Sequence, residues 1–383
     1  MPAFQFGAAL LLSLLTLSAA AQSPATDSVA TSAPIKKPRR VKIAVLPIVF
    51  SQPETGLAYG AAVLPVWRFG ADTTTRSSNA RVLAYRTQRK QSSASLTHSI
   101  FTPGERWFVG GEAQYFNFPI YYYGVGNDTR KSEKSDISYE VFILNQRVLK
   151  RVRPGLFVGG LYRLTNMYNV RIDDALTDDG TRPNWLLERD ARERQATLTS
   201  GIGPALLYDT RDNILSAHHG RFLDASVLFA GKTLGSDYGF TRMQFDARQY
   251  WVLGPLETER TVLAGQVQGI FHSGAVPFRE LANLGGERMM RGIYEGRFRD
   301  RQMLSAQAEV RQQLFWRLRG VLFGGVGQVQ PKVTDFRPGQ FNLAGGAGLR
   351  IDVNRKDRLS IRIDYGVGSG ESSGLYFAFN EAF

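Results

Sequence analysis

The sequence predicts an all-β fold: a transmembrane, antiparallel, up-and-down β-barrel of about 16 strands. Apolar and polar residues alternate along many short segments from residue 41 onward, as expected for strands with one face toward lipid and one toward a watery lumen. Gly, Pro, Asn and Asp stand at the joints between these segments. No segment after residue 21 approaches the ~20 apolar residues that a membrane-spanning helix needs.

The first 40 residues have the composition of a targeting segment and a linker. Residues 1–21 are predicted to be a signal peptide, because their apolar stretch is shorter than the ~20 residues of a spanning helix and small residues precede Gln22. A buried helix is the alternative, since no Lys or Arg precedes the apolar stretch. Residues 22–40 are rich in Pro, Ser, Thr and Ala and are predicted to be a disordered linker. Residues 41–383 then form the barrel domain.

The chain is basic and contains no cysteine. It has 47 Lys and Arg against 34 Asp and Glu, a formal net charge of +13. Such a charge could indicate a nucleic-acid ligand. Basic residues spread along alternating strands better fit a basic lumen and rims that face anionic lipid headgroups, so no nucleic-acid partner is predicted. The lack of Cys excludes disulfides, thiolate metal sites and a cysteine nucleophile.

The alternation also places the strands. In Leu359–Val367, for example, Leu, Ile, Ile, Tyr and Val alternate with Ser, Arg, Asp and Gly. Both ends of such a barrel lie on the same side of the membrane, so the strand number must be even. An even count requires the first segment, although its Pro47 suits only an edge or a ladder defect. Strands are predicted near residues 41–50, 57–69, 78–87, 91–101, 106–118, 136–148, 153–168, 196–210, 220–231, 236–251, 258–271, 303–315, 317–328, 341–354, 359–368 and 374–383.

One polar, glycine-rich segment, Leu284–Asp300, interrupts the strands and carries a family resemblance. Its Leu284–Glu287 and Arg291–Tyr294, followed by Ala308–Arg311 and Phe323–Gly327, resemble the C-terminal signature of the bacterial surface-antigen superfamily, which includes BamA and TamA. The resemblance implies a long extracellular loop folded into the lumen of an outer-membrane barrel. Residues 119–135, 169–195 and 272–302 would then lie outside the cell.

The resemblance further implies a loop anchor in the lumen, formed by Arg291, Gly292, Tyr294 and Glu309. Gly292 would permit a tight turn, Tyr294 would pack against the wall, and Arg291 would pair with an acid on a later strand. This chain departs from the family at Ile293, which separates Gly292 from its aromatic residue, and at Gly325, where the family commonly has Asp. We therefore expect Arg291 to rely on Glu309.

Asp352 and Asp364, on later strands, are the expected substitutes for the missing second acid. We also expect that replacing Gly325 with Asp would partly restore the anchor.

Two further segments fit the family. Asp209, Arg211 and Asp212 resemble a periplasmic turn, and turn-forming bonds are favoured over a catalytic or metal cluster. The last ten residues, 374–383, resemble the outer-membrane sorting signal, in which a glycine precedes a strand with apolar residues on one face and a final Phe. The residues of that predicted signal are Gly374, Phe377, Phe379 and Phe383.

No pattern of an enzyme is found. The four histidines show no H-E-x-x-H spacing, and no G-x-S-x-G is present. His98 stands beside Ser99 without the rest of a lipase-like site. No catalytic residue, metal or cofactor is therefore predicted. The run Tyr121–Tyr123 could stack a sugar, but an aromatic belt at the membrane interface is favoured.

By resemblance, the expected function is to aid the insertion of proteins into the bacterial outer membrane, or their translocation across it, through a weak seam between the first and last strands. The alternative is a passive pore or structural barrel, because residues 22–40 are too few for the periplasmic POTRA domains that many family members carry. The expected partners of this monomeric barrel are outer-membrane lipid with anionic headgroups, and a periplasmic protein or an unfolded client.

Overall fold

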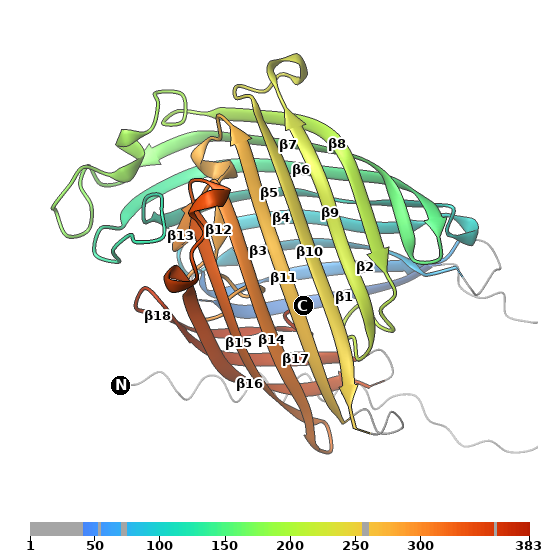
Figure 1. Ribbon diagram of the computed structural model, residues 1–383. Coiled ribbons are helices and arrows are strands. Elements are labelled where there is room, and N and C mark those ends of the chain that lie inside the picture. The colour runs from blue at the N-terminus through green and yellow to red at the C-terminus, as the bar shows by residue number, and fades with distance from the viewer. Residues whose placement is uncertain (1–40, 53–54, 70–74, 255–259, 356–357) are drawn as a thin grey trace, which may run out of the picture. The chain divides into compact units, whose positions relative to one another are not determined.

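The computed structural model describes residues 41–383, except 53–54, 70–74, 255–259 and 356–357 (Figure 1). The predicted signal peptide and linker lie outside the described residues. No helix among the described residues is long and apolar enough to cross a membrane.

Sixteen strands of the described chain close into one antiparallel barrel, so the predicted fold and even strand number are confirmed. Each strand pairs with its neighbours in sequence, except that β11 pairs with β14 across a long insertion and β1 pairs with β18. The barrel strands are β1 (Val41–Gln52), β2 (Gly56–Trp67), β3 (Ser78–Thr87), β4 (Ser92–Phe101), β5 (Trp107–Tyr122), β6 (Ser135–Arg153), β7 (Leu156–Ile172), β8 (Thr197–Asp209), β9 (Gly220–Ala230), β10 (Phe240–Leu253), β11 (Thr261–Gly274), β14 (Gln302–Phe315), β15 (Leu318–Gln330), β16 (Asn342–Asn354), β17 (Leu359–Gly368) and β18 (Ser372–Phe379).

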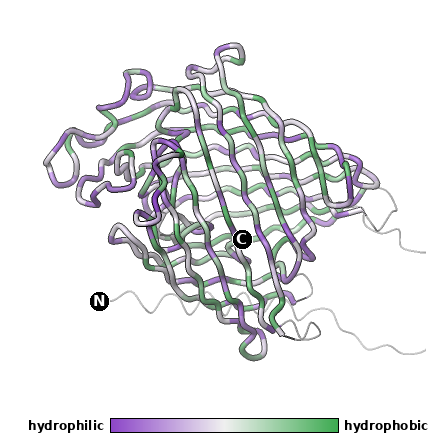
Figure 2. Tube along the Cα trace, viewed as in Figure 1, coloured by the Kyte–Doolittle hydropathy of each residue, from purple (hydrophilic) through white to green (hydrophobic). Residues whose placement is uncertain are grey.

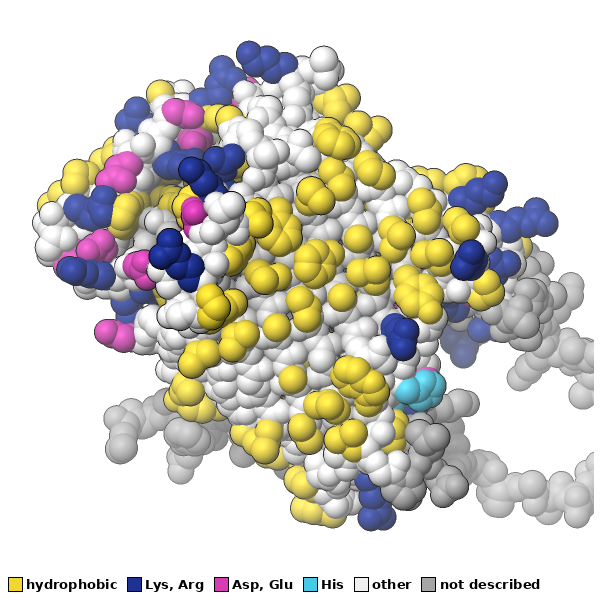
Figure 3. Space-filling model, viewed as in Figure 1, with side chains coloured by type: hydrophobic (Ala, Val, Ile, Leu, Met, Phe, Trp, Pro, Cys, Tyr) yellow, Lys and Arg dark blue, Asp and Glu magenta, His cyan; other side chains and the backbone are white. Residues whose placement is uncertain are grey.

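The alternation in sequence becomes an alternation in space. On β17, Ser360, Arg362 and Asp364 are buried on the inner face, whereas Tyr365 and Val367 are exposed on the outer face. Hydrophilic and hydrophobic residues alternate along the strands in Figure 2. In Figure 3, apolar side chains spread over the visible barrel wall while charged side chains gather at the two ends of the strands. This is the surface that a lipid-embedded barrel requires.

The first strand forms despite Pro47, and it closes the barrel weakly. β1 pairs with β2 over its whole length, with Pro47 opposite Ala61. Its pairing with β18 has one register position among the described residues, Ser51 opposite Phe377. Proline cannot donate a ladder bond, so its presence next to this seam agrees with its usual place at an edge.

The insertion between β11 and β14 folds back into the lumen. Its two ends form a hairpin of β12 (Ala282–Leu284) and β13 (Phe298–Asp300), two short strands at the ends of the segment that the sequence predicted to be irregular. An apolar cluster attaches this lumenal loop to the wall: Leu284, Ile293 and Phe298 pack with Met303 on β14 and Val329 on β15. Between the two short strands, the chain is free to present its polar residues to the barrel interior.

Candidate functional site

Arg291 lies at the tip of the lumenal loop with its side chain fully buried. Its guanidinium donates from Nη2 to Glu309 on β14 and from Nη1 to Asp364 on β17, the latter at 2.5 Å. The guanidinium also lies over the ring of Phe323 on β15, 3.7 Å from the centroid. Three strands of the wall therefore hold one loop residue. A charge-assisted bond of this kind contributes about 1.5–3 kcal/mol.

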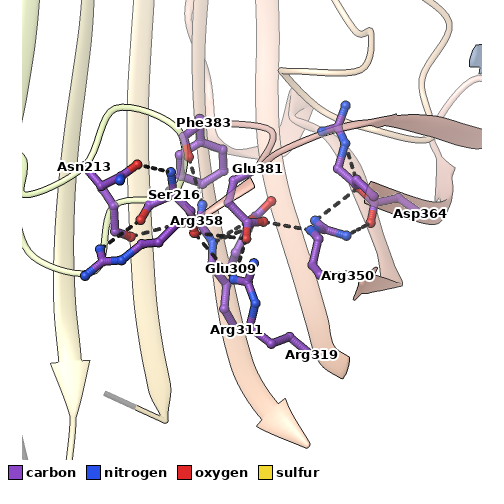
Figure 4. Close-up of polar contacts among 12 residues, drawn as sticks. Asn213, Ser216, Glu309, Arg311, Arg319, Arg350, Arg358, Asp364, Glu381 and Phe383 are labelled. Atoms are coloured by element: carbon purple, nitrogen blue, oxygen red, sulfur yellow. Dashed lines mark hydrogen bonds and ion pairs between the residues drawn. The ribbon is translucent and has the colours of Figure 1, made fainter. Parts of the chain in front are cut away.

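The two carboxylates that hold Arg291 belong to a closed ring of ion pairs. Asp364 also accepts from Arg350 on β16 (2.5 Å), and Glu309 also accepts from Arg311 (2.9 Å). Both Arg350 and Arg311 then reach one further carboxylate, Glu381, at 2.7 and 3.8 Å. The lumenal ion ring thus alternates three arginines with three acids and is neutral; in order, its members are Arg291, Asp364, Arg350, Glu381, Arg311 and Glu309. Figure 4 labels its members other than Arg291.

The ring follows from the sequence of each strand. Glu309 and Arg311 are two residues apart on β14 and so face the same side, with exposed Val310 between them. Arg350 and Asp364 come from the inner faces of the neighbouring strands β16 and β17. Ionised groups buried in this way are costly unless every one is paired, which the ring achieves.

Glu381, which the sequence did not predict as a site residue, completes the ring. Its side chain is buried just beyond the end of β18 and also accepts from Arg319 on β15 at 2.8 Å. Burial opposes its ionisation, but Arg311, Arg350 and Arg319 hold the pKa of Glu381 well below its ordinary value. The sequence feature that could have indicated this role is an acid at the end of an otherwise aromatic and apolar strand.

The predicted strand 374–383 is therefore wrong at its end. β18 stops at Phe379, and the last residues turn into the lumen (Figure 4). Phe383 is only 6% exposed, packs with Tyr250 and Ala264, and its carbonyl accepts from Arg311 at 2.8 Å. The physical reason is that the inward arginines of β14–β16 need a counter-ion, and Glu381 can supply it only if the chain bends inward.

The other predicted signal residues lie on β18 as alternation requires. Gly374 faces the lumen opposite Gly366, and Phe379 is exposed on the outer face. Phe377 lies at the seam opposite Ser51.

Gly292 and Tyr294 hold the loop tip on either side of buried Ile293. Gly292 has φ 107°, and a Cβ there would lie 2.6 Å from the backbone of Val367, so only glycine fits. The ring of Tyr294 packs on Tyr121 and Tyr123, with centroids 5.7 and 5.9 Å apart. The aromatic-belt interpretation is wrong for Tyr122 and Tyr123, which are buried and pack on Phe278 and Tyr294 of the lumenal loop.

A different strand supplies the acid that the family commonly has at the position of Gly325. Asp364 supplies the second carboxylate, whereas Asp352 bonds to Arg319 at 2.9 Å. A Cβ at Gly325 would lie 2.9 Å from the sulfur of Met290 in the lumenal loop. An Asp at position 325 would therefore have to displace the side chain of Met290, and on this geometry we expect it to loosen the anchor rather than restore it.

Of the three residues predicted for the turn between β8 and β9, Arg211 and Asp212 lie in it and Asp209 is the last residue of β8. Asp209 accepts twice from Arg211, at 3.0 and 2.9 Å. Asp212 accepts from the backbone amides of His218 and His219 and from the side chain of Arg358. These bonds fix the turn, and the described residues contain no group of three or more acids, histidines or cysteines placed to bind a metal. The charged groups of the lumen can therefore hold the lumenal loop in place through ion pairs.

Comparison with known proteins shows that the chain matches a known family. A model described as the Omp85 superfamily domain matches residues 75–383. Among solved structures, BamA from Haemophilus ducreyi lacking POTRA domains 1–3 is similar at TM-score 0.58 and 12% identity, over 89% of this chain and 70% of that chain. CdiB from Escherichia coli is similar at TM-score 0.58 and 10% identity, over 89% of this chain and 62% of that chain. No curated protein sequence matches the chain.

Proposed function

The chain belongs to the Omp85 superfamily and is a bacterial outer-membrane barrel, and on that premise we propose that it helps proteins insert into that membrane or cross it. The observation that supports this proposal best is the seam. β1 and β18 meet at Ser51 and Phe377, whereas every other neighbouring pair of strands is joined along a ladder of several registered residues. A client strand could pair with either edge if the seam opened, because the edges of strands present free backbone donors and acceptors.

The proposed activity is assembly or transport, without catalysis. The lumenal loop and the inward C-terminal segment fill part of the barrel interior, which disfavours the alternative of a wide passive pore. Single-channel conductance separates the two candidates. A passive pore would conduct steadily, whereas the proposed function predicts low conductance that rises when the ion ring is broken.

A disulfide across the seam tests the proposal. The chain has no cysteine, so Ser51→Cys with Phe377→Cys creates one defined pair. Cells that depend on this variant should lose outer-membrane or exported proteins under oxidising conditions and regain them with reductant, measured by quantitative mass spectrometry of membrane and medium. The matched control is Ala61→Cys with Ala84→Cys, which links two residues that are opposite each other on β2 and β3.

The control disulfide should change nothing, because β2 and β3 already pair along their length. If deletion of the protein leaves the census of outer-membrane and exported proteins unchanged, the proposed function is wrong. If deletion changes the census but the seam disulfide does not, the activity does not use the seam.

A further inference from the structure

A cavity of about 800 Å³ lies in the barrel lumen beside the lumenal loop. Strands β1–β3, β5 and β6 form one side of it. The lumenal loop, the β8–β9 turn, the C-terminal segment and a few residues of β10, β17 and β18 form the rest. Its volume falls within the ~300–1,000 Å³ that small-molecule sites occupy. The ion ring contributes only Glu381 to its lining, so the cavity is distinct from the loop anchor.

The strand side of the cavity is apolar, contrary to the usual polar lumen of such barrels. The inward residues of β1 and β2 that line the cavity are apolar, like their outward neighbours. The lining includes Leu46, Ile48, Phe50, Leu64, Leu83 and Phe116. A lumen that carried only water or ions would not need such a wall, because apolar surface gains free energy only when it leaves water.

The charged lining of the cavity is basic, with seven arginines and three glutamates. One of these arginines, Arg81, lies on the strand side at β3. Of the arginines, Arg211, Arg248 and Arg362 are bonded to Asp209, Asp246 and Glu287.

Three arginines of this cavity have no ion pair with a carboxylate among the described residues. Arg81 on β3 and Arg279 in the turn η5 (Phe278–Glu280) each have a buried Nε without a hydrogen-bond partner. Arg279 instead lies 5.2 Å from the centroid of Phe116. Arg299 on β13 donates to the carbonyl of Gly296 and lies 5.0 Å from the ring of Tyr122. The charge of Arg279 thus lies beside Phe116, an aromatic residue of the apolar wall.

We propose that this cavity binds an amphipathic anion with a single acyl chain, of the fatty-acid class. The chain would lie along the inner faces of β1–β3, where Ile48, Leu64 and Leu83 replace water. The carboxylate would accept from Arg81 and Arg279, since planar guanidinium groups bind carboxylates and phosphates through paired charge-assisted bonds. A free inorganic anion would leave the apolar wall wet. An uncharged lipid would leave the buried Nε atoms of Arg81 and Arg279 without an acceptor.

A photoreactive fatty acid tests the proposal on the full-length protein in lipid nanodiscs. The probe is a diazirine derivative of palmitic acid, and the readout is mass-spectrometric mapping of the labelled residues. We expect labels on inward residues such as Leu64 and Leu83, competed by oleate. Oleyl alcohol has the same chain without the charge and should compete at least tenfold less well, and inorganic phosphate should not compete.

Substitutions separate charge from packing. Arg81→Gln with Arg279→Gln should lower lumenal labelling at least tenfold while leaving labels on the lipid-facing residues unchanged. The control is Arg130→Gln, an exposed arginine outside the cavity. Migration of unheated samples on gels verifies that each variant is folded. A monoalkyl phosphate that competes as well as oleate assigns the site to the shared anionic head of single-chain lipids.

Three outcomes overturn the inference. Labels confined to lipid-facing residues would show that the probe only partitions into the bilayer. Equal competition by oleyl alcohol would remove the role of the arginines. Lumenal labelling that persists unchanged in the folded double variant would show that another part of the lumen holds the anion.

Discussion

The backbone amide of Gly292, at the tip of the lumenal loop, donates a hydrogen bond to the hydroxyl of Tyr376 on β18, at 3.0 Å. Tyr376 is fully buried and adjoins Phe377, the residue of β18 that meets β1. The loop anchor and the seam therefore share a strand. Holding the loop in place also holds β18 in place, so loosening the loop should also loosen β18, and the reverse.

Tyr376→Phe should loosen both the lumenal loop and β18. It leaves the buried amide of Gly292 without its acceptor, which costs about 1–3 kcal/mol. We expect faster hydrogen exchange in residues 290–294 and in β18, measured by mass spectrometry. Tyr365→Phe on β17 is the control, because that residue faces outward and is exposed. Equal exchange in the two variants would show that the bond does not couple the loop to β18.

Glu309→Gln should free the loop. It removes one charge from the ion ring and leaves Arg291 and Arg311 short of a partner, at a cost of about 3–5 kcal/mol for a buried pair. We expect trypsin to cleave the lumenal loop faster and single-channel noise to rise. Glu112→Gln, a glutamate on β5 outside the ring, should change neither. A loop equally resistant in both variants would show that the apolar cluster alone holds it.

Gly325→Ala should also loosen the loop, since its Cβ would lie 2.9 Å from the sulfur of Met290. Gly325→Asp should do the same rather than strengthen the anchor. The double variant Gly325→Ala with Met290→Ala should recover part of the protease resistance, because the smaller side chain makes room. If Gly325→Asp protects the loop better than wild type, the steric argument is wrong.

Glu381→Gln should lower the temperature at which the barrel converts to the slowly migrating, unfolded form on gels. It leaves Arg311, Arg319 and Arg350 with one carboxylate fewer among them. The matched control is Glu371→Gln, in the exposed turn between β17 and β18. An unchanged transition would mean that packing of Phe383, and not the charge of Glu381, keeps the C-terminal segment in the lumen.

The outer loops should resist mild acid. Burial favours protonation of Glu280, but Arg163 and Arg242 lower its pKa to about 2. A carboxylate whose pKa is depressed in the fold stabilises it above the unfolded pKa of roughly 4.3, and this contribution is lost as the pH falls toward 2. Pepsin should therefore begin to cut residues 275–281 only well below pH 4. Glu280→Gln should lose that dependence on pH.

Local patterns predicted the barrel well. Period-two alternation and the requirement for an even number gave 16 strands, and the same alternation placed Glu309 on the inner face beside outward Val310. The resemblance to the surface-antigen superfamily is confirmed by the family match. Each of these inferences depends on residues close together in the chain, where side-chain direction is fixed by the strand itself.

The ion ring could not be predicted in the same way. Its carboxylates come from β14, β17 and the C-terminal segment, and which acid meets which arginine depends on the register of several strands at once. Asp364 and Asp352 were equivalent in sequence, yet one meets Arg291 and the other Arg319. The inward bend at Glu381 could not be predicted, because the aromatic and apolar residues before it follow the pattern of a continuing strand.

Because the ion ring is closed and neutral, it also constrains how this protein can change over generations. A lineage that loses one acid keeps a surplus positive charge in a dry compartment, and one that loses an arginine keeps a surplus negative charge. Substitutions at positions 291, 309, 311, 350, 364 and 381 should therefore be inherited in compensating pairs, one acid with one base. Exposed apolar residues on the outer face of the same strands, such as Val310, have no such partner and can be substituted singly. Related sequences should therefore show paired changes in the ring and independent changes on the outer face.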